Sequence, residues 1–238
     1  MPARTRRSTE VILSRIFPFA MLQSMTGGQS RRLSDFMRAE PKSRPRTKPP
    51  DERRDELMNA AQCLFLEQGV GPTTIEQITS AADVAKGTFY LHFSSKEDVR
   101  IALGERFAQQ HLAKIKAALD DKSEDDWKGK LATWAVACAA GYLDSIRLHD
   151  VLFYGTRPPT REGLVNNVVI DHLVELLQAG LEAGAWSIDD SRFTAIFLFS
   201  GLHGIVDDAY TKEKRVNRSR LTHRLERLCF RAVGLSLG

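Results

Sequence analysis

Residues 73–99, TTIEQITSAADVAKGTFYLHFSSKEDV, constrain the fold most, because they leave room only for short helices joined by a tight turn. Thr74 and Gln77 have the spacing of a capping box, which predicts that a helix starts there. Asp83 follows where the chain must turn, and aspartate tolerates a left-handed backbone better than most residues. A second short helix is predicted to begin at Val84.

The second helix divides its residues between an apolar and a polar face. Phe89 and Phe93 can turn inward. The residues left pointing outward are Lys86, Gly87, Thr88, Tyr90 and His92. A cation, a hydroxyl, a phenol and an imidazole can donate hydrogen bonds to phosphate oxygens or base edges. Because Gly87 also lets a backbone approach closely, this face suits a nucleic-acid groove.

A third helix is predicted directly after this pair. Either Ser94 with Glu97 or Ser95 with Asp98 can cap it, and its first turn carries Lys96. A helix N-terminus beside a lysine favours anions, so this turn is a candidate phosphate contact.

Residues from about 52 to 100 resemble the N-terminal domain of the TetR family of bacterial transcription regulators. The features that carry the resemblance are Ala60, Ala61 and Phe65 in the first helix, Gly69 at its end, the Thr74 cap, the run 84–90, the pair 92–93 and the run 95–97. Two positions depart from the family pattern. Asp83 stands where glycine is usual, and Ala85 stands where a serine usually caps the recognition helix.

The resemblance implies a homodimeric DNA-binding repressor that responds to a small-molecule effector. It assigns DNA contact to Thr74, Lys86, Gly87, Thr88, Tyr90, His92 and Lys96. A two-fold dimer would place two recognition helices in successive major grooves, roughly 34 Å apart, and so read a palindrome. Double-stranded operator DNA, a second copy of the chain and an effector are therefore the expected partners.

The charge is divided unevenly along the 238 residues. Before residue 51 there are eleven Lys and Arg against three Asp and Glu, and the remainder has 23 against 27. The basic pI therefore belongs to the first fifty residues, and DNA binding by the rest must depend on individually placed side chains.

Three regions are expected along the chain. Residues 1–50 are predicted to be a disordered basic leader, because residues 38–50 are rich in proline and cations. This leader is either a basic arm that adds DNA affinity or a solvated tail. Residues 51–98 are predicted to form the helix-turn-helix domain, and residues 99–238 a helical domain for ligand binding and dimerisation.

Several classes of protein are disfavoured by the sequence. Cys63, Cys138 and Cys229 lie far apart on apolar helix faces, which is typical of reduced core thiols in a cytoplasmic protein. No run approaches the roughly 18 apolar residues of a membrane span. No phosphate loop, nucleophile elbow, HExxH or paired-cysteine motif is found, so we expect neither an enzyme nor a cofactor.

The remainder of the chain has helical periodicity throughout, which predicts an all-α fold with a three-helix head and a helical-bundle body. Near the C-terminus, leucines recur at heptad spacing beside four arginines, and small residues in the preceding helix allow close approach. The resemblance implies a four-helix dimer interface here, with Gly201, Gly204, Leu221, Leu225 and Leu228. An intramolecular seam for the leucines and a solvated face for the arginines are the alternatives.

The effector site is expected among the central helices, because regulators resembling this chain usually hold a small molecule there. The amphipathic candidates are Trp134, Tyr142, His149, Phe153, His172, Phe197 and His203. Metal sensing is an alternative, since His172 with Glu175 and His203 with Asp207 lie one helical turn apart. A helical dimer that has lost DNA binding is another. No metal site is predicted in the leading hypothesis.

Overall fold

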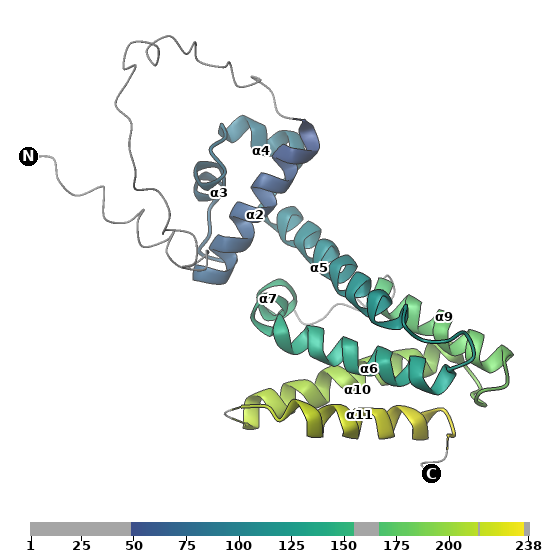
Figure 1. Ribbon diagram of the computed structural model, residues 1–238. Coiled ribbons are helices and arrows are strands. Elements are labelled where there is room, and N and C mark those ends of the chain that lie inside the picture. Colours follow the sequence, from purple (N-terminus) through teal and green to yellow (C-terminus); the bar gives the residue numbers. More distant parts are fainter. Residues whose placement is uncertain (1–48, 155–166, 214, 236–238) are drawn as a thin grey trace, which may run out of the picture. The chain divides into compact units, whose positions relative to one another are not determined.

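The structure is a computed structural model that describes residues 49–154, 167–213 and 215–235, and within these ranges the chain forms helices and no strand (Figure 1). The all-α prediction is therefore confirmed. The leader predicted over residues 1–50 lies outside the described residues, apart from its last two prolines.

The N-terminal head is built from short helices on the start of a long one. Its elements are α2 (Pro50–Gln68), α3 (Ile75–Ala81), α4 (Lys86–His92) and the first turns of α5 (Lys96–Leu119). Proline suits the first turn of α2, where its missing N–H is not needed. Gly69 ends α2 with a φ of 85°, a left-handed conformation that glycine adopts without a steric penalty.

The head has a core of its own. Phe65, Ile78 and Phe89 are fully buried in it, which fixes α2, α3 and α4 against one another. Val99 and Leu103 of α5 belong to the same core. The head therefore draws on side chains beyond residue 98, and the predicted boundary at that residue stays a prediction.

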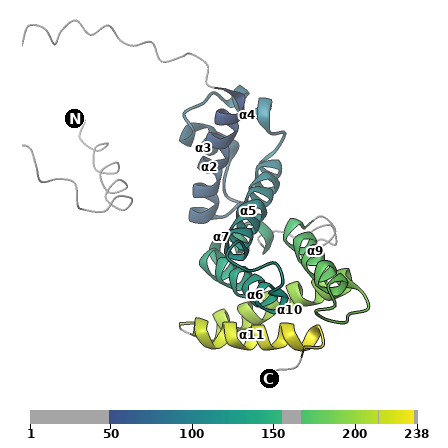
Figure 2. The same ribbon diagram turned by 45° about the vertical axis from the view of Figure 1, so that its right-hand side comes forward.

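The body is formed by helices packed around a second core. They are α5, α6 (Trp127–Asp144), α7 (Ile146–His149), the π-helix η1 (Asp150–Tyr154), α9 (Val168–Glu182), α10 (Ser191–Lys212) and α11 (Arg218–Ala232). In both ribbon views α11 lies beside α6 (Figures 1 and 2). Asn167, Asp190 and Asn217 each cap the helix that follows with a side-chain oxygen.

The segment that follows α6 is not one continuous α-helix. It has one turn of α7 followed by the π-helix η1. Within η1, Leu152 is buried in the head core. The neighbouring Phe153 packs its ring against Gly104 of α5, where a Cβ would be in van der Waals contact with that ring.

The three cysteines differ in their exposure. Cys138 and Cys229 are buried as predicted, but Cys63 is exposed on α2, because the apolar face of that helix is supplied by residues such as Leu57, Ala61 and Phe65.

Among the described helices, none combines the length and the apolar composition needed to cross a bilayer.

Candidate nucleic-acid interface and effector site

Helix α3 starts at the predicted capping box. The Thr74 hydroxyl accepts a hydrogen bond from the Gln77 amide at 3.2 Å, and the Gln77 side chain accepts one from the Thr74 amide at 2.9 Å. Both bonds satisfy N–H groups that the helix itself cannot pair. Thr74 is thus an exposed residue at the N-terminus of α3, where a phosphate would also be favoured.

The turn between α3 and α4 uses a left-handed residue, as the sequence predicts. Asp83 has a φ of 52°. Among the non-glycine residues that the structure describes, Asp83 alone has a positive φ. The prediction that α4 begins at Val84 is wrong by two residues. The Val84 amide donates to the Thr79 carbonyl at 3.0 Å as part of the turn, and Ala85 is still extended. Helix α4 therefore begins at Lys86, with no side-chain cap from Ala85.

Helix α4 turns one face into the head core and the other to solvent. Phe89 is fully buried and packs edge-on against Tyr90 and obliquely against Phe93. On the other face Tyr90 is 52% exposed, and Gly87 has open space where a Cβ would stand. Thr88 and His92 are partly buried at the edges of this face.

Two lysines predicted to contact DNA have partners in this structure. Lys86 Nζ lies 2.5 Å from Glu76 Oε1 of α3, and this hydrogen-bonded ion pair raises the pKa of Lys86 and lowers that of Glu76. Both side chains are exposed, so the ion pair is weak, and Lys86 can exchange Glu76 for a phosphate as its partner.

Lys96 is held more firmly. Its Nζ donates to the Gly71 carbonyl at 2.7 Å and to the Thr73 carbonyl at 2.6 Å. It therefore ties the loop before α3 to the start of α5. Of the two predicted caps for α5, the structure has Ser95, whose hydroxyl accepts from the Asp98 amide at 3.1 Å.

A cluster of aromatic and histidine rings lies in the body, and we call it the aromatic cluster. Its members are Phe107 and His111 of α5, Tyr142 of α6, His149 of α7, Phe153 of η1, and Phe199 and His203 of α10. Neighbouring ring centroids are 4.1–6.1 Å apart, from Phe199–His203 to Phe107–His111. The cluster therefore joins α5 and α10 to the continuous stretch formed by α6, α7 and η1.

The cluster contains four of the predicted effector-site residues and three that the sequence analysis missed. Tyr142, His149, Phe153 and His203 lie together here, and their role in an effector site stays a prediction. Phe107, His111 and Phe199 were not among the candidates. The sequence does contain a signal for these residues. The pairs Phe107–His111, His149–Phe153 and Phe199–His203 are each four residues apart, the spacing at which side chains of one helix meet.

The histidines of the cluster are held neutral. Burial, together with a smaller effect of the nearby His203, lowers the pKa of His111 to about 4 and that of His149 to about 3. Burial also lowers the pKa of His203, whose Nδ1 donates to the Phe199 carbonyl at 2.9 Å. The Tyr142 hydroxyl donates to Asp207 Oδ1 at 2.5 Å. The cluster thus brings together aromatic faces and neutral imidazoles, with the Asp207 carboxylate hydrogen-bonded to Tyr142.

The remaining predicted effector-site residues lie elsewhere. Phe197 is 63% exposed on α10, so its assignment to an interior pocket is wrong, because the other face of that helix supplies the core. Trp134 is buried in the body core and His172 is partly buried on α9. Their Nε1 and Nδ1 atoms, respectively, have no hydrogen-bond partner within the described ranges.

The metal-site candidates do not assemble into a site. No group of three His, Cys, Asp or Glu side chains able to hold a metal ion occurs in the part of the chain that the structure describes. His203 and Asp207 are instead engaged by the Phe199 carbonyl and the Tyr142 hydroxyl.

The C-terminal helices correct part of the predicted dimer interface. Leu221 and Leu225 are 6% and 2% exposed in the body core, so their assignment to a dimer interface is wrong: α6 of the same chain covers them. Leu228 is 46% exposed. Gly201 and Gly204 of α10 are exposed with open space above them, and Phe193 and Phe197 share that helix's outer side.

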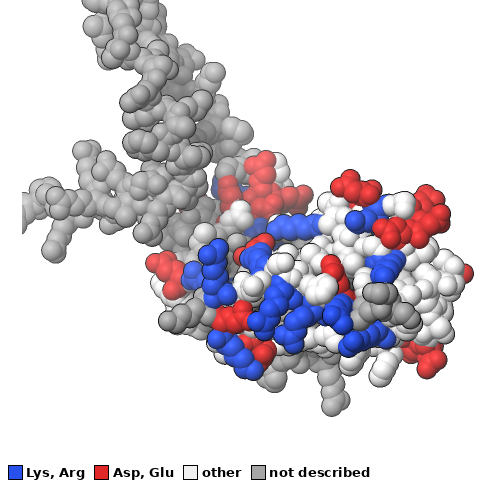
Figure 3. All heavy atoms as spheres, turned by 60° about the horizontal axis from the view of Figure 1, so that its bottom comes forward, with Lys and Arg blue, Asp and Glu red and all other residues white. Residues whose placement is uncertain are grey.

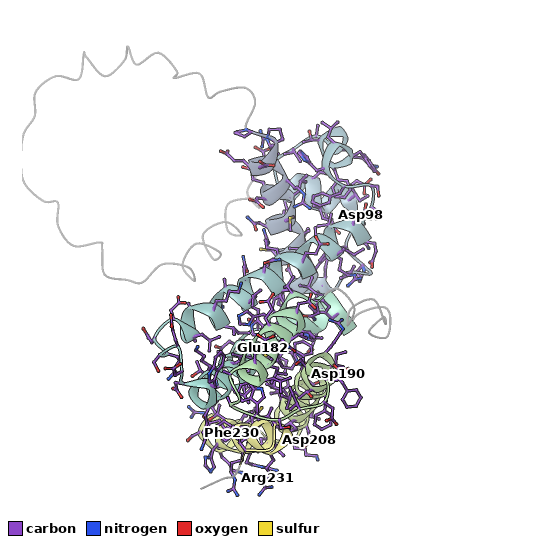
Figure 4. The ribbon with its side chains drawn as sticks, turned by 90° about the vertical axis from the view of Figure 1, so that its right-hand side faces the viewer. Asp98, Glu182, Asp190, Asp208, Phe230 and Arg231 are labelled. Carbon is purple, nitrogen blue, oxygen red and sulfur yellow. The ribbon has the colours of Figure 1, made fainter. Side chains whose placement is uncertain are left out.

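The outer side of α11 carries an arginine stripe, which lies on the face brought forward in Figure 3. Its members are Arg220, Arg224, Arg227 and Arg231. None of them forms an ion pair within the described ranges, whereas Arg218, at the start of the same helix, lies 2.5 Å from Asp144 Oδ1. Arg231 projects away from the body near the end of α11 (Figure 4).

A surface groove of about 910 Å³ lies where α6, α10 and α11 meet. It is lined by Leu143, Tyr210, Thr211, Lys212, Glu213, Arg215, Val216 and Arg218. The groove shares no lining residue with the aromatic cluster, and none of the predicted effector-site residues lines it.

The fold and the site together define a class: a capped helix-turn-helix head, with an exposed polar and aromatic second helix, on an all-α body. Residues 57–103 match the family model described as bacterial regulatory proteins, tetR family. The head of this chain therefore belongs to the TetR family of bacterial regulatory proteins.

Individual relatives agree with this assignment. The transcriptional regulator YerO of Bacillus subtilis is 32% identical over 80 residues, which cover 34% of this chain and 26% of YerO. The regulator SrpR of Pseudomonas putida is 26% identical over 159 residues, covering 64% of this chain and 72% of SrpR. The solved structure of the fatty acid degradation regulator FadR of Bacillus halodurans has a TM-score of 0.60 and 26% identity, covering 77% of this chain and 96% of FadR. These relatives are transcription regulators and not enzymes.

Proposed function

We propose that this chain is a cytoplasmic homodimeric repressor that binds palindromic operator DNA through α3 and α4 and is released by a small-molecule effector. The observation that carries the DNA part is the outer face of α4. Lys86, Gly87 and Tyr90 are exposed there, while Phe89 anchors the opposite face in the head core. A rigidly held helix with a free polar face is what major-groove reading requires.

The predicted contact residues divide into two kinds. Lys86, Tyr90 and the Gly87 backbone lie on the face that would enter the groove, with Thr88 and His92 at its edges. Thr74 would offer the N-terminus of α3 to the phosphate backbone. Lys96 would act mainly by holding the loop at Gly71 and Thr73, with its remaining N–H available to a phosphate.

The aromatic cluster supports an effector site because it adjoins the segment that reaches the head. Phe153 contributes its ring to the cluster, and the preceding Leu152 is buried in the head core. Arg100 of α5 also donates to the Leu152 carbonyl. A ligand that separated the rings would displace η1 and thereby change the support of the head.

A second copy of the chain would cover the outer side of α10. Phe193 and Phe197 are 74% and 63% exposed, and Gly201 and Gly204 leave space for a close helix. Such a row of apolar and small residues is costly in water and suits a two-fold contact. Leu228 of α11 would lie at its edge. The two heads would then address half-sites roughly 34 Å apart.

Binding to a duplex selected from a random pool tests the DNA assignment. The matched pair is Tyr90→Ala and Tyr210→Ala, because the two tyrosines are 52% and 48% exposed but lie on the head and the body, respectively. We expect Tyr90→Ala to weaken binding about tenfold or more, with Tyr210→Ala near the parent. Equal affinities for the two variants would contradict the assignment. A parent protein without salt-dependent duplex binding would favour a helical dimer that acts without DNA.

Sedimentation of the purified protein tests the dimer. Phe197→Asp should convert the dimer to a monomer, because a charge would be buried without a partner at the contact. Ile101→Asp is the control, since Ile101 is 48% exposed on α5, away from the proposed surface. A dimeric Phe197→Asp protein would rule out α10 as the interface.

A further inference from the structure

Leu91 is the most exposed large apolar residue in the described part of the chain. Its exposed fraction is 81%, compared with 52% for the neighbouring Tyr90 and 0% for Phe89. It makes no contact that would hold it in the head core. A leucine in the last turn of a short helix that is turned almost entirely to solvent contributes little to the stability of the head.

The position of Leu91 on α4 places it beside an open surface. It lies four residues after Gly87, so the two share one side of the helix. Helical side chains lean toward the preceding turn, which directs Leu91 over Gly87, where nothing stands within 4 Å of a Cβ position. An incoming group can therefore reach the leucine side chain and the Gly87 backbone together.

The chemistry of the leucine side chain restricts what it can recognise in a duplex. It can neither donate nor accept a hydrogen bond, so phosphates, sugars and the polar base edges gain nothing from it. Among the groups displayed in the major groove, the 5-methyl of thymine is the apolar one.

From this geometry we propose that Leu91 contacts a thymine methyl and makes a T·A base pair part of each operator half-site. This inference rests on the proposed DNA binding through α4. It adds a sequence-reading residue that is not among the polar contact candidates. Lys86 and Tyr90 then contribute polar contacts from the adjoining part of the exposed surface of α4, while Leu91 distinguishes thymine by its methyl group.

The expected effect follows from the burial of one methyl group. Losing it should weaken binding about fourfold in each half-site, since a buried methylene contributes about 0.8 kcal/mol and tenfold in affinity corresponds to about 1.4 kcal/mol. A dimer that loses the methyl in both half-sites should bind roughly fifteenfold more weakly, because separate contacts add.

Deoxyuridine substitution provides the test, because it removes the thymine methyl and leaves base pairing intact. A duplex is selected from a random pool with the full-length protein, and each thymine in the half-sites is then replaced symmetrically. We expect the parent to be sensitive at one thymine position. Leu91→Ala should bind the thymine and deoxyuridine duplexes equally, while Ile101→Ala, another exposed apolar residue, should keep the parent's sensitivity.

The outcomes separate the two claims. No salt-dependent binding of any duplex by the parent would overturn the proposed function itself. Binding without a sensitive thymine, or a Leu91→Ala protein that retains the parent's sensitivity, would overturn the role of Leu91 and leave DNA binding intact.

Discussion

Replacing Ala85 with serine should stabilise the protein, because α4 lacks a side-chain cap. Ala85 is the N-cap residue, with φ −68° and ψ 149°, the extended conformation that capping serines adopt. The Thr88 amide already donates to the Ala85 carbonyl at 2.9 Å, so the first turn is formed and needs no rearrangement. Ala85 is also exposed, which leaves room for a hydroxyl.

The magnitude can be taken from the same head. Thr74 and Ser95 cap α3 and α5 through side-chain oxygens 3.2 and 3.1 Å from the amide nitrogens they satisfy. A capping side chain of this kind is worth about 1 kcal/mol compared with alanine. For a folded region of this size we expect the midpoint of thermal unfolding to rise by about 2–4 °C.

Thermal and urea unfolding followed by far-ultraviolet circular dichroism measures the change. Ala113→Ser is the control, because Ala113 is exposed in the interior of α5, where serine is a poorer helix former than alanine. The same substitution should thus stabilise at residue 85 and destabilise by about 0.5 kcal/mol at residue 113. An Ala85→Ser protein that is no more stable than the parent would refute the capping argument.

Three further predictions concern stability. Leu152→Ala should lower the free energy of unfolding in urea by about 2–5 kcal/mol, because Leu152 is 1% exposed in the head core, whereas Ile101→Ala at an exposed site should change it by less than about 0.5 kcal/mol. Lys96→Met should cost about 1–3 kcal/mol in the absence of DNA, since two backbone carbonyls lose a charged donor; an unchanged melting curve would leave phosphate contact as its only role. Stability should fall as the pH drops from about 6.5 toward 4, because the unfolded chain binds protons at His111 and His149 that the folded chain excludes, and His149→Phe should reduce this loss in urea titrations at pH 7 and 5.

Local chemistry made the head predictable from the sequence. The Thr74 and Gln77 box, the left-handed Asp83 and the Ser95 cap each depend on residues within a few positions of one another. Such interactions are encoded in spacing alone, and the structure has all of them. The start of α4 was misplaced because the Val84 amide bonds back to Thr79, a choice that the residue types do not reveal.

The body was predictable only in its periodicity. The heptad pattern correctly placed Leu221 and Leu225 on one face of α11, but it could not say that α6 covers that face. Likewise, an aromatic side chain such as Phe197 fits a pocket or an outer surface equally well. Tyr142 contacts His149 of α7 and His203 of α10, and no local pattern pairs Tyr142 with a residue as distant in the sequence as His203.

The arginine stripe on α11 gives the protein two opposed responses to ionic strength. Its like charges lie three or four residues apart without an ion-pair partner in the described ranges, so they repel one another along the helix. Added salt screens that repulsion and should make the folded body more resistant to unfolding. The same salt weakens attachment to a duplex. The conditions that best preserve this protein in storage are therefore those in which it is least able to hold DNA.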